Sequence, residues 1–217
     1  MRLSAPVREF DAQPPLSSEL HNAVIASVRW AWSQLRIDRR IEPMTADEEP
    51  LTNEIEKLLN EVRGGRRRAK WLRLFGTVER SGQQRGSGTS YRQSPDLKFQ
   101  PRALARGVTD LSAWGLFAEC KVVGPKRHHA VDTWYCEQGV AKFADGRYAP
   151  RMSSGLMVAY VRDGRTPYAT LHPLLKGVPL YVNETDEHLL TSRHDRTTLP
   201  HPCVAIELTH LWLDARS

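Results

Sequence analysis

Two charged residues inside an apolar segment are the first candidates for chemistry. Glu119 and Lys121 lie two residues apart within the run WGLFAECKVV (114–123). Because side chains alternate along a strand, both would emerge on one face while Cys120 points to the other. Burying charges in such a strand is costly unless they pair or bind a metal. We therefore expect Glu119 and Lys121 to share one wall of a site.

A carboxylate from another segment extends this set. Asp96 follows Pro95 in SYRQSPDLKFQ (90–100), which has the texture of a strand. If this segment pairs with the strand of Glu119, the two carboxylates converge. Their oxygens are hard ligands that suit Mg²⁺ or Mn²⁺. The sequence thus predicts a divalent-cation site, and a structural ion pair between Glu119 and Lys121 is the plainer alternative.

A helix ahead of these strands offers a further carboxylate. Thr45 and Glu48 have capping-box spacing, Pro50 falls in the first turn, and the helix is expected to end at Gly64. Its apolar stripe consists of Leu51, Ile55, Leu58, Leu59 and Val62. At 100° per residue Glu54 lies at the border of this stripe, where it would look into a cleft beside the core.

The remaining elements place these residues in an α/β domain. Strands are predicted over 71–79, 90–100, 114–123, 154–162 and within 202–215, and helices over 16–37, 130–144 and within 167–177. The order helix, strand, strand, strand, helix, strand between 45 and 162 implies a mixed sheet covered on both faces. Residues 1–44 read as a helical extension and 45–217 as the main domain, with a core over 45–162 and additions over 163–217.

Together these features resemble the PD-(D/E)xK nuclease superfamily, which has the restriction endonuclease-like fold. The likeness covers about residues 45–162 and rests on Pro95-Asp96, on the triplet Glu119-Cys120-Lys121 and on the helix that contains Glu54. It implies a central mixed β-sheet flanked by helices, here with an N-terminal helical extension.

The resemblance also implies a role for each residue. Asp96 and Glu119 would bind Mg²⁺ or Mn²⁺, and Cys120 would add its backbone carbonyl as a third ligand. Lys121 would orient or activate the attacking water. Glu54 is the natural candidate for the helix glutamate that many members place in the site.

Several alternatives stay open within this interpretation. The triplet Asp96-Leu97-Lys98 also has an acid two residues before a lysine, which makes Lys98 a rival to Lys121. Glu61 is the second choice for the helix carboxylate. Tyr135 and Gln138 are candidates to line the cleft from the next helix, whereas His210 in the last strand is expected to be a hydrogen-bonded core residue.

The charge distribution points to a polyanionic partner. The net charge is +6, and residues 63–92 carry 9 basic groups and 1 acidic group. Of the 31 basic residues 24 are arginine, whose planar fork suits phosphate oxygens. The partner is expected to be DNA, with RNA not excluded, and a solvated basic loop is the plain alternative. The candidate nucleic-acid contacts are Arg66, Arg67, Arg68, Lys70, Lys126 and Arg127.

The resulting function is a metal-dependent endonuclease that hydrolyses phosphodiester bonds in DNA, in a setting such as restriction, recombination or defence against mobile elements. One alternative is a non-catalytic nucleic-acid-binding or scaffolding subunit. Another is a protein-interaction module whose partner docks on the helix of Trp30 and Trp32. A chain of 217 residues suggests a homodimer or a subunit of a larger complex.

Composition also sets an expected compartment. No apolar run approaches the roughly 20 residues of a membrane span, and the N-terminus lacks the apolar centre of a secretory signal. The spacing of Cys120, Cys136 and Cys203 favours neither a disulfide framework nor a zinc pair. We therefore expect no membrane contact and a cytoplasmic protein with reduced thiols.

Overall fold

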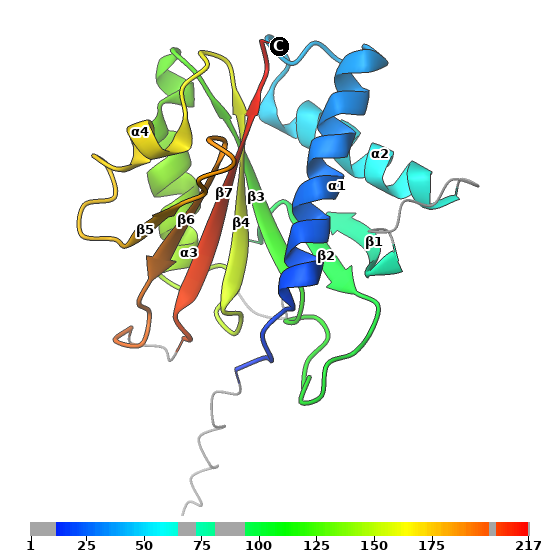
Figure 1. The fold of residues 1–217 in the computed structure, drawn as a ribbon, viewed down its shortest axis with the longest axis vertical. Helices are drawn as coiled ribbons and strands as arrows, with labels where there is room; N and C mark the ends of the chain where they lie inside the picture. The colour runs from blue at the N-terminus through cyan, green and yellow to red at the C-terminus, as the bar shows by residue number, and fades with distance from the viewer. Residues whose placement is uncertain (1–11, 65–72, 81–93, 200–202, 217) are drawn as a thin grey trace, which may run out of the picture.

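The computed structural model describes residues 12–64, 73–80, 94–199 and 203–216. Within this part of the chain a seven-stranded sheet lies between two helical layers, with α1 and α2 on one face and the helices after β3 on the other (Figure 1). The α/β class, the mixed sheet and its cover of helices are therefore as predicted.

The elements follow one another as α1 (Ser18–Ile37), α2 (Glu48–Gly64), β1 (Phe75–Arg80), β2 (Leu97–Pro101), β3 (Leu116–Val123), the 3-10 turn η2 (Arg127–His129), the π-helix η3 (Val131–Val140), α3 (Ala141–Ala144), β4 (Ser154–Val161), α4 (Pro167–Leu171), β5 (Leu180–Val182), β6 (Leu189–His194) and β7 (Ile206–Asp214). The predicted order of elements between 45 and 162 is confirmed. The two short strands β5 and β6 were not predicted.

The strand order in the sheet is β1-β2-β3-β4-β7-β6-β5. The three central strands β3, β4 and β7 are parallel, and both sides of the sheet continue in antiparallel pairs. A crossover between the parallel strands β3 and β4 needs a connection on one face, which η3 and α3 supply. This connection brings η3 against the strand that carries Glu119 and Lys121.

Helix α1 packs on the sheet beside α2. The Ser17 hydroxyl caps the helix by accepting from the backbone N–H of Leu20 at 3.2 Å. Trp32 stacks on Tyr160 of β4 with 5.3 Å between ring centroids, and its indole donates to the carbonyl of Asp214 at 3.2 Å. The N-terminal extension thus shares one hydrophobic core with the sheet and α2.

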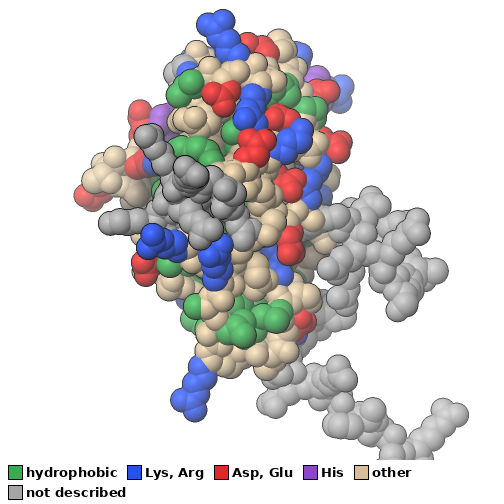
Figure 2. Space-filling model, turned by 90° about the vertical axis from the view of Figure 1, so that its right-hand side faces the viewer, with side chains coloured by type: hydrophobic (Ala, Val, Ile, Leu, Met, Phe, Trp, Pro, Cys, Tyr) green, Lys and Arg blue, Asp and Glu red, His purple; other side chains and the backbone are tan. Residues whose placement is uncertain are grey.

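Helix α2 buries the stripe that the sequence predicts, namely Leu51, Ile55, Leu58 and Leu59, with Val62 partly buried against the same core. Its outer side is paired with neighbouring charges, since Arg40 contacts Glu61 and Arg80 contacts Glu49. Figure 2 shows acidic and basic side chains interspersed on the described part of the face that it draws.

The predicted helix over 130–144 is present but is wound in two ways. The π-helix η3 runs first and the short helix α3 completes it. At Gly139 an added Cβ would lie 2.5 Å from the terminal methyl of Met157, so glycine lets η3 approach β4 closely. A π-helix has more residues in each turn than an α-helix, which changes which side chains face the sheet.

None of the described helices combines the length and apolar character that crossing a bilayer requires. Cys120, Cys136 and Cys203 are free thiols, which agrees with the expected absence of a disulfide framework.

Candidate active site where β2 and β3 diverge

The site begins where a strand pairing ends. Along β3, the antiparallel pairing with β2 extends to Ala118. Beyond that point the backbone N–H of Cys120 donates to Asp96 Oδ2 at 2.7 Å, and the N–H of Val122 donates to Glu48 Oε2 at 3.3 Å. Two carboxylates therefore take the place of a strand partner, and this brings them to the same edge of β3.

The ammonium of Lys121 lies among oxygens at this edge. Its Nζ is 2.9 Å from Glu119 Oε1 and 2.7 Å from Glu48 Oε1, and it donates to the carbonyl of Cys120 at 3.0 Å. Burial alone would lower the pKa of Lys121, but Glu119, Glu48 and Asp96 outweigh this effect and raise it. Lys121 is thus a hydrogen-bond donor and a fixed positive charge at neutral pH.

Glu119 is 3% exposed, and the two oxygens of its carboxyl group have different surroundings. Oε1 contacts Lys121 and accepts from the hydroxyl of Tyr148 at 3.4 Å, and Tyr148 in turn accepts from Lys142 at 3.1 Å. Oε2 is buried and has no hydrogen-bond partner among the described residues. Burial and the nearby charge of Asp96 raise the pKa of Glu119 to about 7, against the opposing effect of Lys121.

Trp134 of η3 closes the site from the helical side. Its indole N–H donates to Glu48 Oε2 at 3.0 Å, and its ring centroid is 5.5 Å from Lys121 Nζ. The indole remains 38% exposed. Sequence analysis did not find Trp134 or Tyr148, because the π-helix and the loop that position them have no simple periodicity. It did not find Lys142 of α3 either, because this lysine reaches the site only through Tyr148.

The structure brings together Asp96, Glu119 and Lys121 as the sequence predicted, with the carbonyl of Cys120 beside them. It does not bring Glu54 to this site. Glu54 pairs instead with Lys57 on the same helix at 2.5 Å. The helix glutamate that contacts Lys121 is Glu48, the first residue of α2.

Glu48 reaches the site and Glu54 does not because the N-terminal end of α2 is the end that lies beside β3. The site lies at the N-terminus of α2, so a residue in the first turn reaches it, whereas the border of the apolar stripe does not. Glu48 is engaged with β3 and η3, and the helix begins at Glu48 rather than at a Thr45 cap. The second choice, Glu61, contacts Arg40.

The rival lysine has a different role. Lys98 donates to the carbonyls of Leu111 and Ser112 at 2.8 and 3.0 Å, so it anchors the loop that precedes β3. The lysine beside Glu119 is Lys121.

Of the two residues proposed to line the cleft from the helix, Tyr135 packs in the core instead. The hydroxyl of Tyr135 is buried and lies 2.8 Å from His210 Nδ1, while Gln138 is exposed. Trp134 of the π-helix η3 faces the site. His210 is the hydrogen-bonded core histidine that the sequence predicted.

The candidate nucleic-acid contacts divide into two groups. Lys126 and Arg127 are exposed in the loop and 3-10 turn that follow β3. The predicted contacts from the basic run, Arg66, Arg67, Arg68 and Lys70, lie outside the described residues.

The oxygens at this site can be compared with the ligands that the predicted cation prefers. Among the described residues no three His, Cys, Asp or Glu side chains form a cluster that would hold a metal ion. Mg²⁺, however, commonly uses one or two carboxylates and keeps several waters. Asp96 and Glu119 supply those carboxylates, and the unpartnered Glu119 Oε2 is a buried acceptor of the kind that an ion or water satisfies. The oxygens present therefore fit a hard cation.

Comparison of the chain with protein-family models, with curated proteins and with solved structures finds no match in any of the three.

Proposed function

We propose that this protein is a metal-dependent nuclease of the PD-(D/E)xK type that hydrolyses phosphodiester bonds in DNA. The observation that carries the proposal is the convergence of Asp96, Glu119 and Lys121 where β2 and β3 diverge, with one Glu119 oxygen buried and unpartnered. The element order from α2 to β4 and the parallel pairing of β3 with β4 support the restriction endonuclease-like fold.

Each residue has a distinct part in this chemistry. Asp96, Glu119 and the Cys120 carbonyl would hold a divalent cation, which polarises a phosphodiester and lowers the pKa of a bound water. The positive charge of Lys121 would stabilise the negative charge that develops on the phosphate. Because its pKa is raised, Lys121 supplies charge and does not act as a general base at neutral pH.

Two groups hold these residues in place. Glu48 fixes the Lys121 ammonium from α2, and Tyr148 fixes Glu119 through Oε1. The other Glu119 oxygen is thereby left for the cation. Lys126 and Arg127 would contact the phosphate backbone, and such contacts weaken as salt rises.

The test is Mg²⁺-dependent cleavage of plasmid and single-stranded DNA by the wild type, Asp96→Ala and Lys121→Ala, with Lys57→Ala as a matched control. Lys57 is an exposed lysine whose partner, Glu54, lies away from the site. We expect cleavage to be lost in the first two variants and retained in Lys57→Ala. Folded Asp96→Ala and Lys121→Ala proteins that cut as well as the wild type would disprove the assignment.

A non-catalytic nucleic-acid-binding subunit is the second candidate. It is favoured by the way Lys121 is satisfied by Glu119, Glu48 and the Cys120 carbonyl within the protein itself. This candidate predicts DNA binding that weakens with salt, needs no divalent cation and survives Lys121→Ala. The absence of cleavage together with such binding would select it over the nuclease.

A further inference from the structure

An aromatic ring is held at the edge of the candidate site and remains open to ligand. Trp134 donates its N–H to Glu48 and lies over the Lys121 ammonium, so one edge and one face of the indole are fixed. With 38% of the residue exposed, part of the ring stays accessible. Because the side chain is already ordered, a ligand that stacks on it has little further rotamer entropy to remove.

The neighbours of Trp134 indicate what such a ligand would be. Lys121, whose charge is proposed to stabilise the reacting phosphate, lies 5.5 Å from the centroid of the indole ring. The exposed Lys126 and Arg127 come before η3 in the chain, in the loop and 3-10 turn that follow β3. A ligand that presents negative charge to Lys121 and a flat ring to the indole has the chemistry of a nucleotide unit. Bases within a continuous duplex already stack on both faces, so this contact is open to a base that has left the stack.

We propose that Trp134 is a stacking platform for an unpaired base beside the scissile phosphate, and that the preferred substrate is therefore single-stranded nucleic acid or a duplex with unpaired nucleotides. This inference rests on the proposed function and adds the substrate class to it. Trp134 is then a residue that determines specificity, in addition to holding Glu48.

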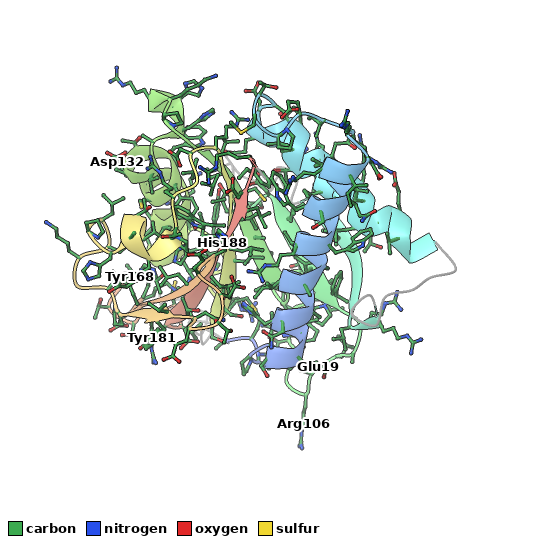
Figure 3. All side chains as sticks on the ribbon, turned by 45° about the horizontal axis from the view of Figure 1, so that its top comes forward. Glu19, Arg106, Asp132, Tyr168, Tyr181 and His188 are labelled. Atoms are coloured by element: carbon green, nitrogen blue, oxygen red, sulfur yellow. The ribbon has the colours of Figure 1, made fainter. Side chains whose placement is uncertain are left out.

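The experiment separates binding from cleavage. Binding of a fluorescent single-stranded oligonucleotide and of its matched duplex is measured by anisotropy without divalent cations, at one fixed salt concentration. The variants are Trp134→Phe, which keeps a flat ring but loses the N–H donor, and Trp134→Leu, which is apolar but not flat. Tyr181→Leu is the control, because Tyr181 is a 53% exposed aromatic on the edge strand β5 (Figure 3).

We expect Trp134→Leu to weaken single-strand binding about tenfold, in line with the loss of one stacked base, and Trp134→Phe to weaken it less than about threefold. Tyr181→Leu is expected to bind as the wild type does. Duplex binding is expected to be weaker than single-strand binding in the wild type and to be the same in all variants.

Equal losses in Trp134→Phe and Trp134→Leu would show that the N–H donor matters and the ring does not, which overturns the inference. Unchanged single-strand binding in Trp134→Leu, a wild-type preference for duplex, or no nucleic-acid binding would also overturn it. A parallel Mg²⁺ cleavage assay distinguishes the two proposals. Trp134-dependent binding without cleavage contradicts the nuclease alone, whereas cleavage that is indifferent to Trp134→Leu contradicts the stacking platform alone.

Discussion

The ammonium of Lys121 shows how charged residues are tolerated inside this fold. A buried cation without a partner is strongly destabilising, but here Glu119 and Glu48 approach it from different elements and the Cys120 carbonyl accepts from it. Lys121 is fully paired, but Glu119 Oε2 remains without a hydrogen-bond partner among the described residues. An unpaired buried acceptor costs about 1–3 kcal/mol, and this cost is relieved when a cation or water binds there.

Glu48 and Glu54 form a matched pair for testing this arrangement. In Glu48→Gln an amide NH₂ group replaces one carboxylate oxygen, so either Lys121 or the pair Val122 and Trp134 loses its acceptor. We expect a loss of about 1–3 kcal/mol in the free energy of unfolding, measured by urea denaturation. Glu54→Gln, which loses a pair with the exposed Lys57, is expected to change this free energy by less than about 0.5 kcal/mol. Equal costs would contradict the role given to Glu48.

Glu48 and Glu54 also show how far single residues of the site can be predicted from the sequence alone. Two-residue spacing in a strand was enough to place Glu119 and Lys121 on one face, because alternation is local geometry. The choice between Glu48 and Glu54 depends on which end of α2 meets β3, and this is decided by the packing of distant elements. Helical periodicity describes the faces of a helix and carries no information about which turn lies beside a site.

At the scale of elements, one arginine fastens the segment that carries Tyr148. Arg196, between β6 and β7, is fully buried and donates to backbone carbonyls of the α3–β4 connection and its surroundings. The acceptors are Phe143, Tyr148, Ala149, Pro150, Met152 and Val204. Burial lowers the pKa of Arg196 to about 10, which leaves the guanidinium charged at neutral pH. The N–H groups of Arg196 thus give the carbonyls of this loop the hydrogen bonds that a helix or a strand partner would otherwise supply.

Removing this guanidinium is expected to be severe. Arg196→Met leaves several buried carbonyls without a donor, so the free energy of unfolding should fall by at least about 3 kcal/mol. Arg193→Met is the matched control, because Arg193 lies 3.9 Å from Glu207 with both side chains more than half exposed. That variant should lie within about 0.5 kcal/mol of the wild type by urea denaturation. A small effect at Arg196 would mean that the loop is held by other contacts.

The elements that sequence predicted well are those with a strong local pattern. The helix expected over 16–37 is observed at Ser18–Ile37, and the strand expected over 154–162 at Ser154–Val161. The strand β5 has three residues and is largely exposed, so its sequence carries no alternation to detect. The strand β6 alternates buried and exposed positions but includes Ser192 and His194 on its buried side, and these polar residues conceal the pattern.

At the scale of the whole molecule, a hydrogen-bonded chain of side chains connects η3 to the strands β7 and β6. Tyr135 accepts from the indole of Trp212 at 3.2 Å and lies 2.8 Å from His210 Nδ1. Ser192 Oγ lies 2.8 Å from both His210 Nε2 and His194 Nε2. Because Tyr135 already accepts from an indole, its own O–H is free to donate a hydrogen bond to His210 Nδ1. His210 then donates to Ser192, and Ser192 donates to His194, so every member is satisfied with both histidines neutral.

The two buried neutral histidines of this hydrogen-bonded chain make the stability of the protein depend on pH. Burial lowers the pKa of His210 to about 3, with a smaller contribution from His194, and burial together with Arg196 lowers the pKa of His194 to about 4, against 6.5 for both in the unfolded chain. Below pH 6.5 the unfolded state therefore takes up protons that the folded state refuses. The free energy of unfolding should fall as pH drops from 6.5 towards 4, by up to about 1.4 kcal/mol per pH unit for each histidine.

His194→Gln tests this dependence, because it removes one titrating group at the end of the chain while keeping a polar side chain beside Ser192. Between pH 6 and 5 we expect the slope of the unfolding free energy against pH to decrease by about 1 kcal/mol per unit, whatever the overall stability of the variant. His172→Gln, at an exposed histidine, should keep the wild-type slope. Comparing slopes removes the contributions of His21 and His129, whose pKa values burial also lowers. A wild-type slope in His194→Gln would mean that His194 titrates alike in both states and that the chain does not hold it neutral.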